Sequence, residues 1–221
     1  MAKQYQLSME LLSDASIASD RGYGAIIDTD IVFDDVGLPY IPAKRLKGVL
    51  RESGEILSNI FKRANIKLEI NIDDIFGKQG RNDWQSAANF IVPNLYIEDY
   101  EKTREFFGSL FSGRGENTAG FNVFNISKDD VISYFTNVRM QTSIDQELGK
   151  TKRHSLRTTR VLDKNMVFGN SFLINEKYID QLLYICAATK KIGSKRNRGF
   201  GEVKIYIKDE NGDILRFKPF E

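Results

Sequence analysis

The sequence predicts a mixed α+β fold whose core strands and helices follow the order βαββαβ, with large insertions. Two patterns carry this prediction. Segments in which apolar and polar residues alternate, typical of half-buried strands, occur near both ends of the 221-residue chain. Two segments between them repeat apolar residues every three or four positions, as amphipathic helices do. Because 41% of the residues are apolar, we expect one domain over residues 1–221.

The N-terminal part begins with a predicted strand and a long loop. The alternating apolar residues of the strand are Tyr5, Leu7, Met9 and Leu11. Residues 13–37 are rich in Gly, Ser and Asp and predict a loop with at most a short strand at 31–33. Loops of this length in compact domains are usually functional.

A helix is predicted next, starting near Pro42, because proline is favoured in a first helical turn. Apolar residues from Leu46 to Phe61 recur with helical spacing. Gly48 and Gly54 each cost the helix about 1 kcal/mol relative to alanine. We therefore expect another part of the chain, or a ligand, to approach this helix closely.

The middle of the chain predicts an insertion at about residues 78–135, with a candidate strand at 90–97 and a helix or further insertion at 98–110. A hairpin is predicted at about 139–161, where two strand-like segments flank a polar, basic excursion.

The C-terminal part returns to a regular pattern. A strand is predicted at 167–174, followed by a helix with Asn175 as its N-cap and Gly193 at its end. The alternation at 203–207 predicts the last strand, and Asn211-Gly212 predicts a hairpin turn. The complete order suits a ferredoxin-like (RRM-like) core.

Composition excludes several classes of protein. The single cysteine, Cys186, and the single histidine, His154, cannot form a disulfide or a zinc site, so we expect no zinc. The N-terminus lacks a signal-peptide pattern, and no apolar stretch approaches the roughly 20 residues that a membrane span needs. We expect a cytoplasmic protein without a membrane partner.

The basic residues are unevenly distributed, although the net charge is only +2. The windows 44–51, 150–160 and 190–198 are rich in Lys and Arg and contain no acid. If the fold brings them to one face, they form a groove for phosphates. The alternative is three separate solvated patches.

Two motifs near opposite ends of the chain resemble those of a known family. Residues 37–52, GLPYIPAKRLKGVLRE, and residues 193–201, GSKRNRGFG, resemble the first-helix segment and the glycine-rich loop of the RAMP superfamily of CRISPR-associated proteins. A helix N-terminus attracts phosphate, and glycines let the backbone approach it closely. The tripeptide at 75–77 matches a further short element of the family.

Residues 139–161 resemble the extended thumb hairpin of the backbone subunits in type III effector complexes. The resemblance implies that the thumb pushes between bases of the guide–target duplex, with Ile144, Leu148 and Leu156 as apolar wedges. The alternative is a mobile basic loop. The three stretches together supply the residues expected to contact RNA: Lys44, Arg45, Lys47, Arg51, Arg153, His154, Arg157, Arg160, Gly193, Ser194, Lys195, Arg196, Arg198, Gly199 and Gly201.

The resemblance implies a guide-RNA (crRNA)-binding subunit of a type III CRISPR antiviral effector complex. Its expected partners are crRNA, target RNA, other effector subunits and further copies of itself along the guide. In target-cleaving relatives, an aspartate in the loop before the first helix supports attack by the RNA's own 2′-hydroxyl, with a divalent cation required. Alignment on LPYIP places Asp28 there, or Asp30 if the register slips by two, whereas Asp34 and Asp35 are expected to be turn residues.

Mg²⁺ or another divalent cation is thus an expected cofactor only if the protein is a nuclease. One carboxylate cannot make a tight metal site, so no residue is assigned as a ligand. Lys44 and Arg45 stand where many cleaving subunits have small residues, which leaves open a catalytically inactive architectural subunit. A crRNA-processing endoribonuclease is disfavoured because the first helix lacks histidine. A generic RRM-like binder would stack bases on an aromatic RNP pattern that the sequence lacks.

Overall fold

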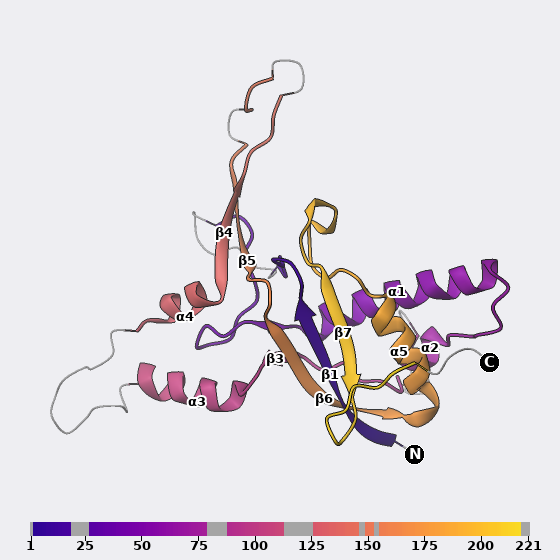
Figure 1. Ribbon diagram of the computed structural model, residues 1–221. Helices are drawn as coiled ribbons and strands as arrows, with labels where there is room; N and C mark the ends of the chain where they lie inside the picture. Colours follow the sequence, from indigo (N-terminus) through magenta and orange to yellow (C-terminus); the bar gives the residue numbers. More distant parts are fainter. Residues whose placement is uncertain are drawn as a thin grey trace.

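A five-stranded antiparallel sheet in the order β2-β3-β6-β1-β7 forms the centre of the protein, which was obtained as a computed structural model (Figure 1). The structure describes residues 2–18, 27–78, 88–112, 126–145, 149–152 and 155–217. The strands of this sheet are β1 (Ala2–Leu11), β2 (Tyr40–Ile41), β3 (Leu95–Ile97), β6 (Val167–Asn175) and β7 (Val203–Lys208).

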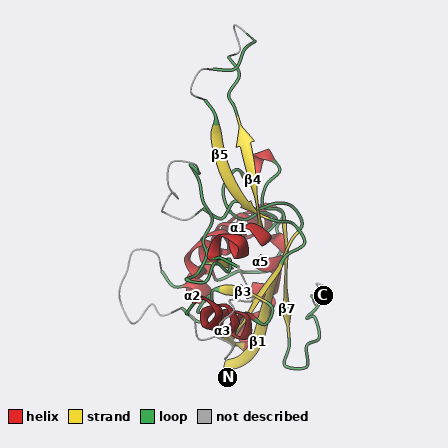
Figure 2. Cartoon of the chain, turned by 90° about the vertical axis from the view of Figure 1, so that its left-hand side faces the viewer, coloured by secondary structure: helices red, strands yellow, loops and turns green. Residues whose placement is uncertain are grey.

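Two helices, α1 (Ala43–Arg63) and α5 (Ile179–Ala188), cover one face of the sheet, as the edge-on view in Figure 2 shows. The elements β1, α1, β3, β6, α5 and β7 follow the predicted βαββαβ order, and their strands pair as β3-β6-β1-β7 with β2 added at the edge. The predicted α+β fold is therefore confirmed. Among the described residues, no helix is both long and apolar enough to span a bilayer.

The core lies between the sheet and these helices. Alternate residues of β1, including Leu7, Met9 and Leu11, are fully buried, as the period of a strand requires. They pack in one cluster with Leu46 and Leu50 of α1. The same cluster contains Cys186, whose burial raises the pKa of the thiol to about 12 and removes its reactivity as a thiolate.

The expected insertion at about 78–135 is shorter than the sequence indicated. Phe90, Val92 and Leu95 are buried in the main core, and β3 pairs with β6. The candidate strand at 90–97 is thus present at its C-terminal end as β3, while its pairing with β6, far along the chain, needed the structure. The excursion contains α3 (Tyr100–Phe111) and α4 (Lys128–Tyr134), and α4 begins with a capping box between Ser127 and Asp130.

The predicted hairpin forms a separate two-stranded sheet of β4 (Thr136–Gln141) and β5 (Arg157–Leu162). It projects from the end of the main sheet where the glycine-rich loop also lies (Figure 1). Val138 and Met140 are exposed on it, to 47% and 70%. Leu148, Arg153 and His154 lie outside the described residues.

Three local predictions differ from the structure or are refined by it. Residues 31–33 form only isolated bridges. Asn175 caps a 3₁₀ turn (Glu176–Tyr178) that precedes α5. Helix α5 ends at Ala188 rather than at Gly193, because the backbone of Thr189 is extended, with φ −78° and ψ 104°. The turn at Asn211-Gly212 forms, with Lys208 bridged to Ile214.

The remaining helices are α2 (Ile72–Phe76) and a 3₁₀ turn, Arg196–Arg198.

Candidate nucleic-acid interface

The glycine-rich loop is fixed to the segment after β1. The Ser194 N–H donates to the carbonyl of Ser16 at 2.8 Å, and the two hydroxyls are 2.9 Å apart. Gly193 and Gly201 have positive φ values, and a Cβ would collide with the carbonyl oxygens of Ser16 and Ile192 respectively. Protein contacts therefore require these two glycines. Gly199 also has a positive φ, and open space surrounds the place of its Cβ.

Lys195 joins this loop to the base of the hairpin. Its ammonium donates to the Thr159 hydroxyl at 2.6 Å and to the Gln141 side chain at 3.3 Å. Its backbone is left-handed, with φ 57°, which is uncommon for a residue with a Cβ. Burial, followed by the charges of Arg198 and Arg157, lowers the pKa of Lys195, and Asp28 opposes this effect.

Helix α1 and the glycine-rich loop share two adjoining hollows, which we call the basic groove. The larger has a volume of about 890 Å³ and the smaller about 320 Å³, and both include Gly193, Ser194 and Arg196. Arg196 lines both hollows, and its guanidinium forms an ion pair with the Glu52 carboxylate of α1 at 2.8 Å. The other cations in the lining are Lys44, Arg45, Arg157, Lys190, Lys191, Lys195 and Arg198. The fold thus brings members of all three basic windows to one place.

Other predicted RNA contacts do not join the basic groove. Lys47 is exposed on α1 but outside the lining of both hollows. Arg51 is directed to the other side, where its guanidinium bonds to the Gly77 carbonyl and the Asp73 carboxylate. Arg160 is paired with Asp30. None of these three residues lines the basic groove.

Asp28 and Asp30, the two candidate catalytic carboxylates, have opposite surroundings. Asp28 is exposed, and its Oδ2 accepts a hydrogen bond from the Thr158 N–H at 2.7 Å, beside the base of the hairpin. The side chain of Asp30 is 1% exposed, and both of its oxygens lie 3.2 Å from Nη1 of Arg160. Asp30 is therefore a buried structural partner, and Asp28 is the carboxylate that RNA can reach.

The N-terminus of α1 differs from the expectation of free N–H groups. The Ala43 N–H donates to Oδ1 of Asn94 at 2.8 Å, and Pro42, the N-cap, supplies a carbonyl for Arg45 and Leu46. Since most of the first-turn donors are already bonded, the side chains of the basic groove are the better phosphate ligands. Sequence reasoning missed Asn94 because it lies 51 residues away.

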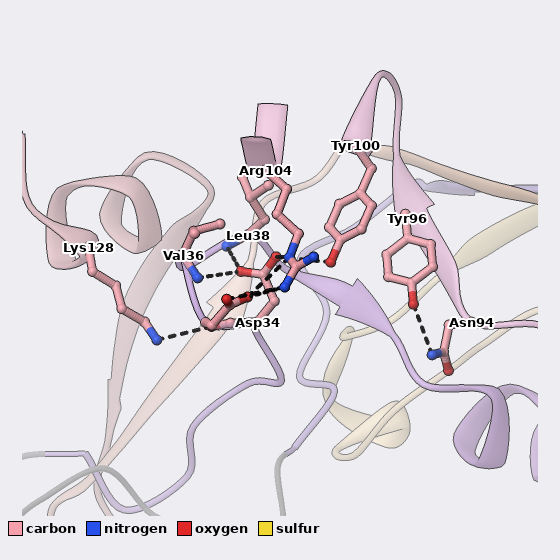
Figure 3. Close-up of polar contacts among 9 residues, drawn as sticks. Asp34, Val36, Leu38, Asn94, Tyr96, Tyr100, Arg104 and Lys128 are labelled. Carbon is pink, nitrogen blue, oxygen red and sulfur yellow. Dashed lines mark hydrogen bonds and ion pairs between the residues drawn. The ribbon is translucent and has the colours of Figure 1, made fainter. Parts of the chain in front are cut away.

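The loop that carries Asp28 is anchored at its other end by Asp34 (Figure 3). Oδ1 of Asp34 accepts the Val36 and Leu38 N–H groups at 3.0 and 2.8 Å, which confirms its turn role. Its Oδ2 accepts the Tyr100 hydroxyl at 3.0 Å, and Lys128 donates to its carbonyl at 3.0 Å. Burial and the Asp34 carboxylate raise the pKa of Tyr100. Helices α3 and α4 therefore hold this loop.

The described part of the chain contains no group of three or more His, Cys, Asp or Glu side chains that could together hold a metal ion. Asp28 could supply only one carboxylate to a metal ion, and the carboxylate of Asp30 already forms an ion pair with Arg160. Within the ranges that the structure describes, the side chains alone do not make a tight divalent-cation site.

Two solved structures are similar to this chain in fold. Chains in two cryo-EM structures of Type III-B Cmr-beta, one bound to cognate target RNA and one in the apo state, share the fold. The first gives a TM-score of 0.59 at 12% identity, covering 92% of this chain and 96% of that one. The second gives 0.63 at 12% identity, with 94% and 98% covered.

No curated protein matches the chain in sequence. The family model of the RAMP superfamily matches residues 21–204, a range that contains both sequence motifs and all the cations that line the basic groove. The chain therefore belongs to the RAMP superfamily.

Proposed function

We propose that this protein binds guide RNA as a subunit of a type III CRISPR antiviral effector complex. The observation that carries the proposal is the basic groove, where cations from α1, the hairpin and the glycine-rich loop meet. Such a groove suits a sugar–phosphate backbone and reads no base sequence, which leaves target selection to base pairing. Target RNA, neighbouring effector subunits and further copies of the chain are the proposed partners.

The open face of the sheet favours the groove over RRM-like base stacking. On that face, the central strands β1 and β6 present no aromatic ring. The residues paired across them are Gln4 with Leu173, Gln6 with Ser171, Ser8 with Gly169 and Glu10 with Val167. Tyr96 and Tyr206 lie on flanking strands. Base-stacking sheets need aromatic rings on their central strands.

Photo-crosslinking tests the proposed binding site. A guide RNA containing 4-thiouridine is bound to the protein and irradiated, and crosslinked peptides are identified by mass spectrometry. We expect adducts in the glycine-rich loop and in the first turn of α1, and none in the last turn of the same helix at Lys62 and Arg63, which is also basic. Adducts concentrated on the open sheet face would contradict the proposal.

A second proposed function is cleavage of the complementary target RNA through Asp28. The supporting observation is that Asp28 is exposed beside the cations of the basic groove, whereas Asp30 is buried in an ion pair. A carboxylate in this position can accept the hydrogen bond, and then the proton, of an RNA 2′-hydroxyl. Mg²⁺ stays an expected requirement, and no protein residue is assigned to hold it.

The cleavage test uses protein assembled on a guide with a labelled complementary target in the presence of Mg²⁺. We expect the wild type to cut, and Asp28→Asn to abolish cutting while crosslinking to the guide persists. A wild type that binds the guide but does not cut would identify an architectural subunit. Cutting by Asp28→Asn would exclude Asp28 as the reactive carboxylate.

A further inference from the structure

Cleavage by a 2′-hydroxyl requires two proton transfers, and one carboxylate explains only the first. The attacking 2′-oxygen loses a proton as its bond to phosphorus forms. The 5′-oxygen that leaves the phosphorus carries a developing negative charge and needs a proton. The inference below rests on the proposed cleavage function and concerns the source of this second proton.

Asp28 and Lys195 are attached to consecutive residues of β5. Asp28 bonds to the backbone of Thr158 through both its N–H and its carboxylate, at 3.0 and 2.7 Å. Lys195 bonds to the hydroxyl of Thr159 at 2.6 Å. One short strand segment therefore fixes a carboxylate and an ammonium near each other, although residues 28 and 195 are far apart in the chain.

The ammonium of Lys195 is held and still able to donate. Two hydrogen bonds, to Thr159 and Gln141, orient it, and a left-handed backbone conformation at residue 195 directs it toward the hairpin. An ammonium has three N–H donors, so one donor remains beyond these two partners among the residues that the structure describes. Lys195 also lines the larger hollow of the basic groove, where a phosphodiester would lie.

The surroundings of Lys195 favour the loss of a proton from its ammonium. Partial burial favours the neutral form, as do the charges of Arg198 from the same loop and Arg157 from β5, while Asp28 favours the charged form. The net result is a lowered pKa, which brings a lysine closer to the range where proton donation is efficient.

We propose that Lys195 is the general acid of target-RNA cleavage and that Asp28 is its base. In this step the bond from the 2′-oxygen to phosphorus forms, and the bond from phosphorus to the 5′-oxygen breaks. The 2′-hydroxyl proton passes to the Asp28 carboxylate, and Lys195 gives a proton to the leaving 5′-oxygen. The products are a 2′,3′-cyclic phosphate and a 5′-hydroxyl, with no oxidant or cosubstrate required.

A target RNA with sulfur in place of the bridging 5′-oxygen tests this role, because a thiolate leaves without protonation. The variants are Lys195→Met, which removes the acid, and Lys195→Arg, which keeps the charge and the donors to Thr159 and Gln141 but is a far weaker acid. We expect both variants to cut the oxygen RNA about 100-fold or more slowly, and the sulfur RNA within a few fold of wild type. Lys62→Met, far from the basic groove on α1, is the matched control.

The pH profile gives a second readout. With the oxygen RNA, the wild-type rate falls as the pH rises through the pKa of Lys195, and with the sulfur RNA that alkaline fall disappears. Equal slowing of both substrates in Lys195→Met, with full activity restored in Lys195→Arg, would reduce Lys195 to a structural anchor and overturn the proposal. If Lys195→Met fails to fold, Lys195→Arg decides alone. A wild type that cuts neither RNA refutes the cleavage function itself, while crosslinking still tests guide binding.

Discussion

Asp28 and Asp30 are separated by one residue, yet one carboxylate is exposed and the other is buried in an ion pair. Asp28 lies at the surface beside β5, and Asp30 is sealed against Arg160. The sequence places both in the same loop and offers both as candidates. It could not separate them, because the partner that buries Asp30 is 130 residues away.

This contrast predicts opposite effects of two alanine substitutions on stability. Asp30→Ala leaves the Arg160 guanidinium buried without its counter-charge, so we expect a loss of about 3 kcal/mol in the free energy of unfolding. Asp28→Ala, at an exposed position, should change it by less than about 1 kcal/mol. Urea unfolding followed by circular dichroism measures both. Equal losses would show that Asp30 does not have the structural role assigned here.

Tyr100 makes a second prediction at the level of one side chain, this time in its dependence on pH. Because its folded-state pKa is raised, its contribution to stability is complete below pH 10 and is lost as the pH rises through the raised pKa. Tyr100→Phe removes the bond to Asp34, which should cost about 1 kcal/mol at neutral pH.

The same substitution should also make stability fall less steeply above pH 10. Melting temperatures measured from pH 7 to pH 11 test both effects, with Tyr134→Phe as the control because that ring is 81% exposed. Parallel alkaline curves for wild type and Tyr100→Phe would contradict the assigned pKa shift.

At the level of elements, regular patterns predicted well where the element is long. The alternation in β1 and β7 identified the core faces correctly. The period of α1 did so for Leu46, Leu50 and Phe61, whereas Ile56 and Ile60, which fit the same period, are exposed to 54% and 52%. The two-residue β2 and three-residue β3 are fixed by pairing with distant strands and carry no pattern of their own. The candidate strand at 90–97 contains β3, whereas β2 was not expected as a strand, and the pairing of both is determined by tertiary contacts that the sequence pattern does not show.

The two glycines of α1 give a prediction about this element. A Cβ at Gly54 would press on Ile72 and Ile185, and overpacking of this kind costs about 1–3 kcal/mol, more than the helix gains from alanine. A Cβ at Gly48 meets nothing within 4 Å. We expect Gly54→Ala to destabilise the protein and Gly48→Ala to stabilise it by up to about 1 kcal/mol.

Thermal unfolding of the two variants gives the sign of each change. Stabilisation by Gly54→Ala would mean that α1, α2 and α5 pack less tightly than the structure shows. The sequence predicted a close approach to α1 at both glycines. At Gly54, α2 and α5 make that approach. At Gly48 no part of the described chain does, and this glycine lines the smaller hollow of the basic groove.

At the level of the whole molecule, the sheet order assembles what the sequence leaves dispersed. The basic windows near residues 44, 157 and 195 lie far apart in the chain, and a net charge of +2 gives no sign of a shared surface. They meet because β1 lies beside β7, which brings the glycine-rich loop to Ser16, and because Lys195 ties that loop to the hairpin. The family resemblance indicated all three parts of the groove, whereas the links through Gln141, Thr159 and Glu52 required the structure.

The salt dependence of guide binding tests the basic groove most directly. For single-stranded RNA, the slope of log K against log salt concentration is about −0.7 for each phosphate neutralised. The substitutions Lys44→Ala, Arg157→Ala and Arg198→Ala combined should therefore weaken binding and make the slope shallower by about 2. The control combines Lys62→Ala, Arg63→Ala and Lys67→Ala, an equal loss of charge on exposed residues at the far end of α1. An unchanged slope in the groove variant, or an equal change in the control, would contradict the assignment of this groove as the RNA-binding site.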